Sequence, residues 1–228
     1  MRMRVLSIVH QRDAGSGVFA HAVAERGDEL IESVPSERRP PGDGFDAVLV
    51  FGGAMNVDDH HQWLRGEKEL LRSALDGGTP TLGVCLGAQL LAEAAGGSAR
   101  PATTPEHGWK AVDLLPAAAS DPVLAPLPPR FAALEWHRYE MRPPDTAFEL
   151  ARNAACLQAF RVGRAWGVQF HAEVTQPTVE RWVRDHDGEL DRDAILADTR
   201  REIDGWNTLG IGLCRRFLDT CADDRKAP

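Results

Sequence analysis

The sequence predicts an α/β protein in which a mostly parallel sheet carries helices on both faces. Three observations support this prediction. Short apolar runs alternate with helix-patterned segments, which is typical of βαβ units. The run DAVLVFGG, residues 46–53, is apolar almost throughout, as a strand buried on both faces is. Several of the helix-patterned segments end in glycine, which marks a helix stop.

The elements of the first half follow one another in regular alternation. We expect strands at 4–9, 29–34, 46–53 and 79–84, and helices at 17–27, 62–78 and 86–97. The segment 62–78 has the apolar spacing of an amphipathic helix and ends in two glycines. The polar segment 36–44, rich in proline and glycine, is predicted to be a loop.

The second half changes character, because short strand-like runs separated by turns predict a small antiparallel or mixed β section. These runs span 107–115, 130–137, 147–153, 157–163 and 164–174. The turn at Gly163 predicts a hairpin between the last two runs. From Gln176 onward the chain is expected to be helical. We therefore predict one domain at 1–187 and a helical C-terminal extension at 188–228 that packs on it.

Composition and charge exclude several classes of protein. Hydrophobic residues make up 43% of the 228 residues, which is enough for a globular core. The formal net charge of −8 argues against a nucleic acid or an anionic membrane as partner. No apolar run approaches the roughly 20 residues that span a bilayer. The four cysteines form no CxxC pair, so we expect free thiols and a cytoplasmic protein without a signal peptide.

Cys85 stands between glycines in the stretch GVCLG, after a predicted strand and before a predicted helix. This G-x-C-x-G pattern has the form of a nucleophile elbow, a sharp turn that presents a catalytic side chain. Small flanking residues let the turn close. The following helix dipole favours the thiolate, and the N–H of Leu86 could stabilise an oxyanion. The alternative is a structural cysteine buried in a tight turn.

A thiolate nucleophile needs a base, and the base needs an orienting group. His171 and Glu173 follow an apolar strand-like run and would point the same way if the segment stayed extended. His171 could deprotonate Cys85 and later protonate the leaving amine. Glu173 could hold the imidazole in the right tautomer and stabilise its charged form.

The stretch FGGAM supplies a third candidate element at the end of a predicted central strand. Two glycines there, Gly52 and Gly53, let the backbone approach a ligand, and ligands of open α/β sheets bind at that end. The N–H of Gly53 could be the second oxyanion donor. The alternative is an ordinary glycine turn.

The stretches FGGAM, GVCLGAQ and FHAEV, in this order and spacing, resemble the class I, triad-type glutamine amidotransferases. The chain looks closest to stand-alone members similar to the amidotransferase part of GMP synthase. The resemblance implies a flavodoxin-like sheet, a Cys85–His171–Glu173 triad and a substrate contact by Gln89. It also implies hydrolysis of the glutamine side-chain amide through a cysteinyl thioester, with ammonia passed to a separate synthetase.

The sequence departs from the family pattern at two places. Ala172 replaces the proline of the usual H-P-E. The family's glycine-containing substrate loop appears as WHRYE, which makes His137, Arg138 and Tyr139 candidate substrate-binding residues together with Gly52. Arg138 and Tyr139 are bulky where a small residue is common, so recognition of the amino-acid end of the substrate stays open.

Two other functions stay open. A γ-glutamyl peptidase or hydrolase would use the same chemistry on γ-glutamyl compounds, and the lack of an SGGxD-type pyrophosphatase loop favours it. A catalytically quiet binding or regulatory module would lack turnover altogether. We expect no cofactor, and no metal, because the pair His60-His61 has no third ligand at a suitable spacing.

Overall fold

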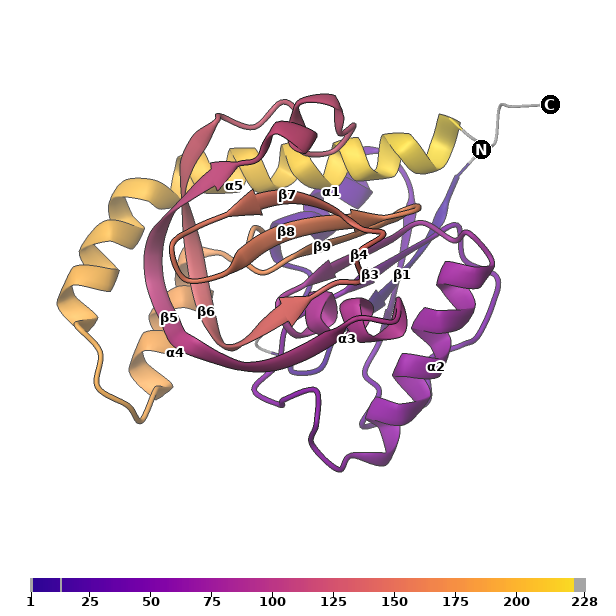
Figure 1. Cartoon of the computed structure of the whole chain (residues 1–228), viewed down its shortest axis with the longest axis horizontal. Helices are drawn as coiled ribbons and strands as arrows, with labels where there is room; N and C mark the ends of the chain where they lie inside the picture. Colours follow the sequence, from indigo (N-terminus) through magenta and orange to yellow (C-terminus); the bar gives the residue numbers. More distant parts are fainter. Residues whose placement is uncertain (1, 13, 224–228) are drawn as a thin grey trace.

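The computed structural model describes residues 2–12 and 14–223 (Figure 1). In this part of the chain, nine strands form one sheet in the order β2-β1-β3-β4-β9-β8-β7-β5-β6. The strands are β1 (Arg4–Ile8), β2 (Glu29–Ser33), β3 (Ala47–Val50), β4 (Thr81–Val84), β5 (Ser98–Leu114), β6 (Arg130–Arg142), β7 (Phe148–Arg152), β8 (Leu157–Val162) and β9 (Ala165–Val168). The helices are α1 (Gly17–Glu25), α2 (Gln62–Asp76), α3 (Leu86–Ala94), α4 (Gln176–Asp185) and α5 (Arg192–Asp223), with a 3-10 helix at Pro116–Ser120.

The sheet joins a parallel half to an antiparallel half. β2, β1, β3, β4 and β9 pair in parallel, whereas β9, β8, β7, β5 and β6 pair antiparallel. The predicted α/β class is confirmed, and the antiparallel section is a continuation of the parallel sheet. The predicted hairpin is also present: β8 and β9 meet at Gly163, with Val162 opposite Ala165.

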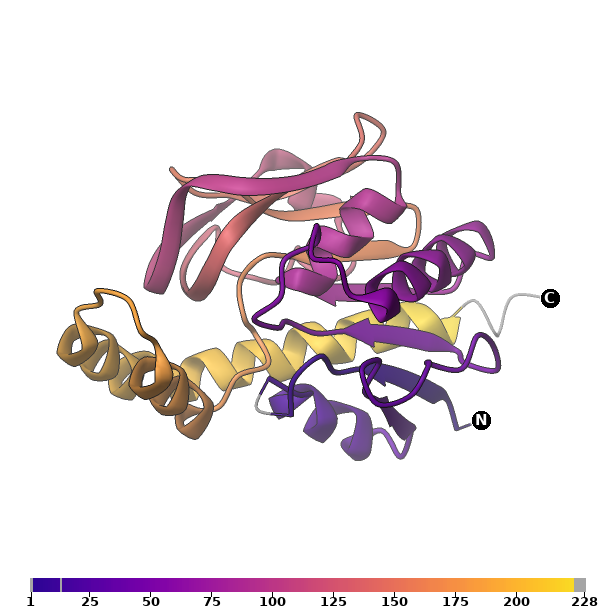
Figure 2. The same ribbon diagram turned by 90° about the horizontal axis from the view of Figure 1, so that it is seen from below.

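Helices cover both faces of the sheet, and a separate apolar core fills each side (Figure 2). α2 and α3 pack on one face, and α1 and α5 pack against each other on the opposite face. Along β3, Val48 and Val50 belong to the core on the side of α2 and α3, whereas Ala47 and Leu49 belong to the core on the side of α1 and α5. Burial on both faces explains why this run is apolar at successive positions rather than at alternate ones.

Two predicted strands differ most from the structure in their boundaries, and the run predicted at 130–137 also continues to Arg142 as β6. The run 164–174 is not extended throughout, because β9 ends at Val168 and the chain then bends. The N–H of His171 donates to the Leu134 carbonyl of β6, so the backbone leaves its neighbours in the parallel half. β5 begins at Ser98, nine residues before the predicted start of its run, because Pro101 and the bulge after it conceal the strand pattern.

The C-terminal helices lie along the same sheet that carries the catalytic candidates. α5 packs against α1 and α4, and Nε1 of Trp206 donates to the carbonyl of His171 at 2.7 Å. The boundary at residue 187 stays a prediction, and the last five residues of the predicted extension lie outside the described residues. Within 2–12 and 14–223, no helix combines the length and apolar character that a bilayer span needs.

Candidate active site

The turn between β4 and α3 holds Cys85 in a strained conformation. Its φ of 52° is the only positive φ among the described non-glycine residues. The turn closes only because its flanking residues lack side chains. A Cβ at Gly83 would lie 2.6 Å from the carbonyl oxygen of Gly87, and a Cβ at Gly87 would lie 2.2 Å from that of Val50. The strand-to-helix elbow predicted from GVCLG is therefore present, and Cys85 stands at the N-terminus of α3.

A buried imidazole and carboxylate lie beside this cysteine. Nδ1 of His171 donates to Oε1 of Glu173 at 2.7 Å, and both side chains are almost fully buried. Burial lowers the pKa of His171, but the Glu173 carboxylate and the Cys85 thiol raise it more, so that it stands well above its usual value. Since Glu173 occupies Nδ1, Nε2 is the ring nitrogen left to face the thiol.

Gly52 lies between Cys85 and His171. A Cβ at this position would approach Cε1 of His171 to 2.8 Å and Cβ of Cys85 to 3.5 Å. Glycine is therefore the residue that lets the end of β3 pass this close to both side chains. Gly53, the next residue, lines the cavities that open in front of Cys85.

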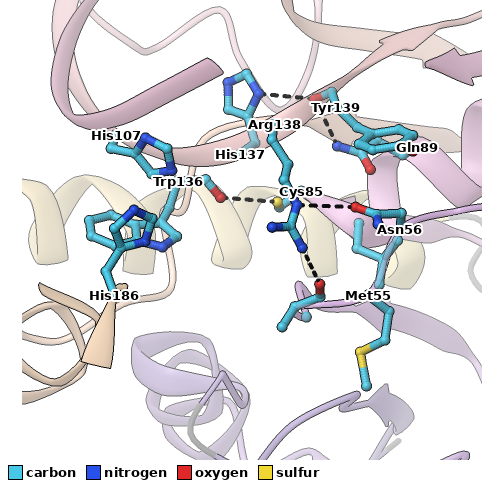
Figure 3. A pocket seen from close by; sticks show the side chains of 13 residues that line it. Met55, Asn56, Cys85, Gln89, His107, Trp136, His137, Arg138, Tyr139 and His186 are labelled. Carbon is cyan, nitrogen blue, oxygen red and sulfur yellow. Dashed lines mark hydrogen bonds between the residues drawn. The ribbon is translucent and has the colours of Figure 1, made fainter. Parts of the chain in front are cut away.

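Two adjoining cavities meet at Cys85, each smaller than the roughly 300–1,000 Å³ of a pocket for a drug-sized ligand. One has a volume of about 180 Å³ and is lined by Gln89 and the WHRYE strand (Figure 3). The other, of about 230 Å³, is lined by His171, Trp182 and Asp185. Both sizes suit a small substrate.

The residues predicted to contact substrate form one wall of the first cavity. Nε2 of Gln89 donates to the carbonyl of Tyr139 at 3.0 Å, so this amide is already tied to β6. The Arg138 side chain extends toward the opposite wall, where it donates to the Ala54 carbonyl at 2.9 Å and to Asn56 Oδ1 at 3.3 Å (Figure 3). The Tyr139 hydroxyl reaches the same segment and donates to Asp58.

His137, also predicted to contact substrate, has both ring nitrogens close to protein groups. It borders the cavity, but Nδ1 donates to the Tyr139 carbonyl at 2.9 Å, and Nε2 lies between the carboxylates of Glu106 and Glu135. Burial lowers the pKa of His137, but these two carboxylates raise it more, to about 10. Both ring nitrogens thus face protein groups.

Aromatic rings enclose the space above Cys85. The His171 ring meets Trp182 edge-on at 4.7 Å between centroids, and Trp136 contacts Trp182 at 5.8 Å. Trp136 also contacts His107 and His186. Burial and the neighbouring His186 lower the pKa of His107 to about 4, so this ring is neutral at neutral pH. The cavities therefore combine an apolar wall with a neutral histidine.

A family model described as glutamine amidotransferase class-I matches residues 17–185. The chain belongs to the class I glutamine amidotransferases. It is 28% identical to the glutamine amidotransferase-like protein YfeJ of Salmonella typhimurium over 198 residues, which cover 82% of this chain and 83% of that protein.

Two further relatives agree with the family assignment. Over 157 residues, the chain is 31% identical to one subunit of the glutamine-hydrolysing GMP synthase of Sulfolobus acidocaldarius, covering 67% of this chain and 76% of that protein. A crystal structure of a Thermotoga maritima glutamine amidotransferase has a TM-score of 0.87 at 26% identity, covering 96% of this chain and 99% of that one. The predicted resemblance to the family is thereby confirmed.

Sequence reasoning missed several residues that shape the site of this amidotransferase. They come from four separate segments and are His10, Glu67, Trp182, His186 and Trp206. Of these, only His10 could have been predicted from the sequence. It follows the first parallel strand, and the carboxyl ends of parallel strands meet at one edge of the sheet, where ligands bind. The other four lie on or after helices whose packing no local pattern specifies.

Proposed function

We propose that this amidotransferase hydrolyses the side-chain amide of glutamine and passes the ammonia to a separate synthetase. One observation carries the proposal: the strained Cys85 stands beside the buried His171–Glu173 pair, where two small cavities meet. A structural cysteine has no need of a strained backbone, an imidazole paired with a buried carboxylate and access to a cavity together.

The reaction follows from these positions. His171 takes the proton of the Cys85 thiol, and the thiolate attacks the amide carbon of glutamine. The N–H groups of Leu86 and Gly53 would stabilise the oxyanion, which is supported by Leu86 being the first residue of α3 and by Gly53 bordering both cavities. His171 then gives its proton to the leaving nitrogen, and ammonia departs. Water, deprotonated by His171, hydrolyses the thioester to glutamate and restores the thiol.

The relatives support a separate ammonia acceptor. The Sulfolobus acidocaldarius relative is by name one subunit of a glutamine-hydrolysing GMP synthase. A chain that corresponds to most of such a protein fits a role as ammonia supplier to a partner synthetase.

A γ-glutamyl amide hydrolase is the second candidate, and the second cavity favours it. His171, the group that protonates the leaving nitrogen, lines this cavity of about 230 Å³ together with Trp182 and Asp185. Ammonia needs little of that space, whereas the amine of a γ-glutamyl amide would occupy it. The same triad would serve both substrates, so only the leaving group distinguishes the two functions.

A substrate panel separates these candidates. Glutamate release is measured with free glutamine, γ-glutamyl dipeptides and glutathione, alone and with a candidate synthetase added. We expect glutamine to be the best substrate. A kcat/KM about 100-fold higher for any γ-glutamyl peptide, roughly 2.7 kcal/mol of transition-state preference, would replace the ammonia-supply function with the second candidate. No release from any substrate, and no preferential labelling of Cys85 by iodoacetamide, would support a quiet module.

A further inference from the structure

A second cluster of reactive side chains lies behind the wall of the first cavity. Glu106 of β5, His137 of β6 and Cys156, just before β8, are all buried there. Oε2 of Glu106 lies 3.3 Å from Nε2 of His137 and 3.9 Å from Sγ of Cys156. The three potential ligand atoms lie within 4.8 Å of one another. Carboxylate, imidazole and thiol thus converge on one point.

Buried polar atoms without hydrogen bonds surround this point. Glu135 is fully buried, and its Oε2 lies 3.3 Å from Nε2 of His137. In the described part of the chain, neither carboxylate oxygen of Glu135 makes a hydrogen bond, nor does Nε2 of His137. Oε1 of the neighbouring Gln158 is also without one. Buried polar atoms without hydrogen bonds are costly. The carboxylate and amide oxygens would gain from a metal cation among them, and Nε2 of His137 would become a ligand on losing its proton.

We propose that Glu106, His137 and Cys156 bind a Zn²⁺ ion. With bonds of about 2.0–2.2 Å to nitrogen and oxygen and about 2.3 Å to sulfur, a tetrahedral zinc ion places its ligand atoms roughly 3.3–3.7 Å apart. Oε2 of Glu106 lies 3.3 Å from Nε2 of His137 and 3.9 Å from Sγ of Cys156, which is close to these values, and the third separation is within 4.8 Å. A mixed nitrogen, oxygen and sulfur set at tetrahedral spacing suits zinc better than magnesium or calcium.

Neighbouring groups already orient the three ligands. Nδ1 of His137 donates to the Tyr139 carbonyl, which leaves Nε2 as the ligand atom. The Asn153 amide donates to Oε1 of Glu106 at 2.8 Å. Nε2 of Gln158 donates to Oε2 of Glu106 at 3.0 Å and to Sγ of Cys156 at 3.4 Å, and a zinc ion would replace these two hydrogen bonds. A backbone carbonyl behind the ligand imidazole and a hydrogen bond to the ligand carboxylate are the usual supports of a zinc site.

The charge balance and the access route also fit. Zinc binding displaces one proton from His137 and one from Cys156. The two charges of Zn²⁺ therefore replace the charges of the two protons, and the buried net charge is unchanged. Glu106 and Asn153 line an open surface cavity of about 840 Å³, which gives an ion a route from solvent. This proposal differs from the expectation of no metal. The sequence could not indicate the site, because its residues lie far apart in the chain and match no metal-binding spacing.

Direct metal analysis tests this proposal independently of any amidase activity. The purified protein is incubated with Zn²⁺, passed over a chelating resin and analysed by mass spectrometry for bound metal. We expect about one zinc per wild-type chain and less than about 0.2 for Cys156→Ala and for Glu106→Gln. Two matched controls, Cys221→Ala and the double variant His60→Ala/His61→Ala, should keep the wild-type content.

Cobalt provides a second readout that needs no variant. The wild-type protein loaded with Co²⁺ should show thiolate-to-cobalt charge-transfer absorption, and this absorption should persist in Cys221→Ala. Wild-type protein without bound zinc, equal zinc in every variant, or cobalt bound without that absorption would each overturn the proposal. Circular dichroism confirms that the variants compared are folded.

Discussion

His10 and Glu67 form a fully buried ion pair, with Nε2 of His10 2.9 Å from Oε2 of Glu67. Nδ1 of the same ring donates to the Phe51 carbonyl at 2.9 Å. Since a carboxylate and a carbonyl can only accept, both ring nitrogens must carry protons, and the ring is an imidazolium. Burial lowers the pKa of His10, but Glu67 and the two carbonyls of Phe51 and Gly52 raise it above its usual value. The pair fixes the segment that carries Gly52.

Glu67→Gln is expected to destabilise the protein in a pH-dependent manner. The expected loss is about 2–3 kcal/mol, because a neutral amide leaves a buried imidazolium without its counter-charge. A raised pKa means that this stabilisation is complete below the unfolded value of about 6.5 and disappears as pH rises through the folded value. The difference from wild type, measured by urea unfolding, should therefore shrink at alkaline pH.

Glu69→Gln is the matched control for that experiment. Glu69 lies on the same helix, but its ion pair with Arg65 is exposed. Its loss should cost less than about 0.5 kcal/mol. Equal losses for Glu67→Gln and Glu69→Gln would contradict the role given to the buried pair.

Cys85→Ala should abolish turnover without unfolding the protein. We expect a loss of about 10⁴-fold or more in kcat, as for removal of a nucleophile, and an unchanged circular dichroism spectrum. Cys221→Ala, which alters another buried cysteine, should keep wild-type activity. A glutamine analogue with a diazo-ketone group should modify Cys85 covalently, as detected by mass spectrometry. Activity of Cys85→Ala within tenfold of wild type would disprove its role.

Glu173→Gln should reduce kcat less than His171→Ala does. In the proposed mechanism His171 moves the protons, whereas Glu173, which is hydrogen-bonded to the ring, orients it and stabilises its charge. Steady-state kinetics with glutamine measures both variants. A larger loss for Glu173→Gln would reverse the assigned roles.

Gly52→Ala tests the close approach of β3 to the base. The new Cβ would press on Cε1 of His171 at 2.8 Å, and we expect kcat to fall by about 100-fold or more. Gly66→Ala is the control, because a Cβ on that α2 glycine meets nothing within 4 Å. It should leave kcat unchanged and stabilise the helix by about 0.5–1 kcal/mol. Similar kcat values for the two variants would show that the contact at Gly52 is unimportant.

Arg138→Ala should raise KM for glutamine and leave kcat within about twofold. Arg138 ties β6 to the Ala54 carbonyl and Asn56 across the first cavity, and losing these bonds should weaken substrate binding by about 1 kcal/mol. Arg142→Ala on the same strand is the control, since Arg142 pairs with Glu140 away from the cavities. An unchanged KM for Arg138→Ala would remove this residue from substrate binding.

The sequence by itself determined the features that depend on neighbouring residues. The elbow at Cys85 could be predicted locally, because two glycines and a strand-to-helix turn lie within five residues, although the close contact that requires Gly87 is with the Val50 carbonyl of β3. The continuous apolar run of β3 likewise records burial on both faces. His171 and Glu173 were predicted to meet along an extended strand. They do meet, although β9 ends at Val168 and a bend brings them together.

Only the tertiary structure decided which charged groups are buried together. In the sequence, Glu67 is one acid of an amphipathic helix and Glu106 is one residue of a proline-rich segment. The tertiary structure buries each of them beside a histidine. The energy of a buried charge depends on the partners that distant strands and helices supply, and no sequence period encodes them. Trp206 also depends on distant partners. Its hydrogen bond to the His171 carbonyl exists only because α5 packs on the sheet face that carries α1.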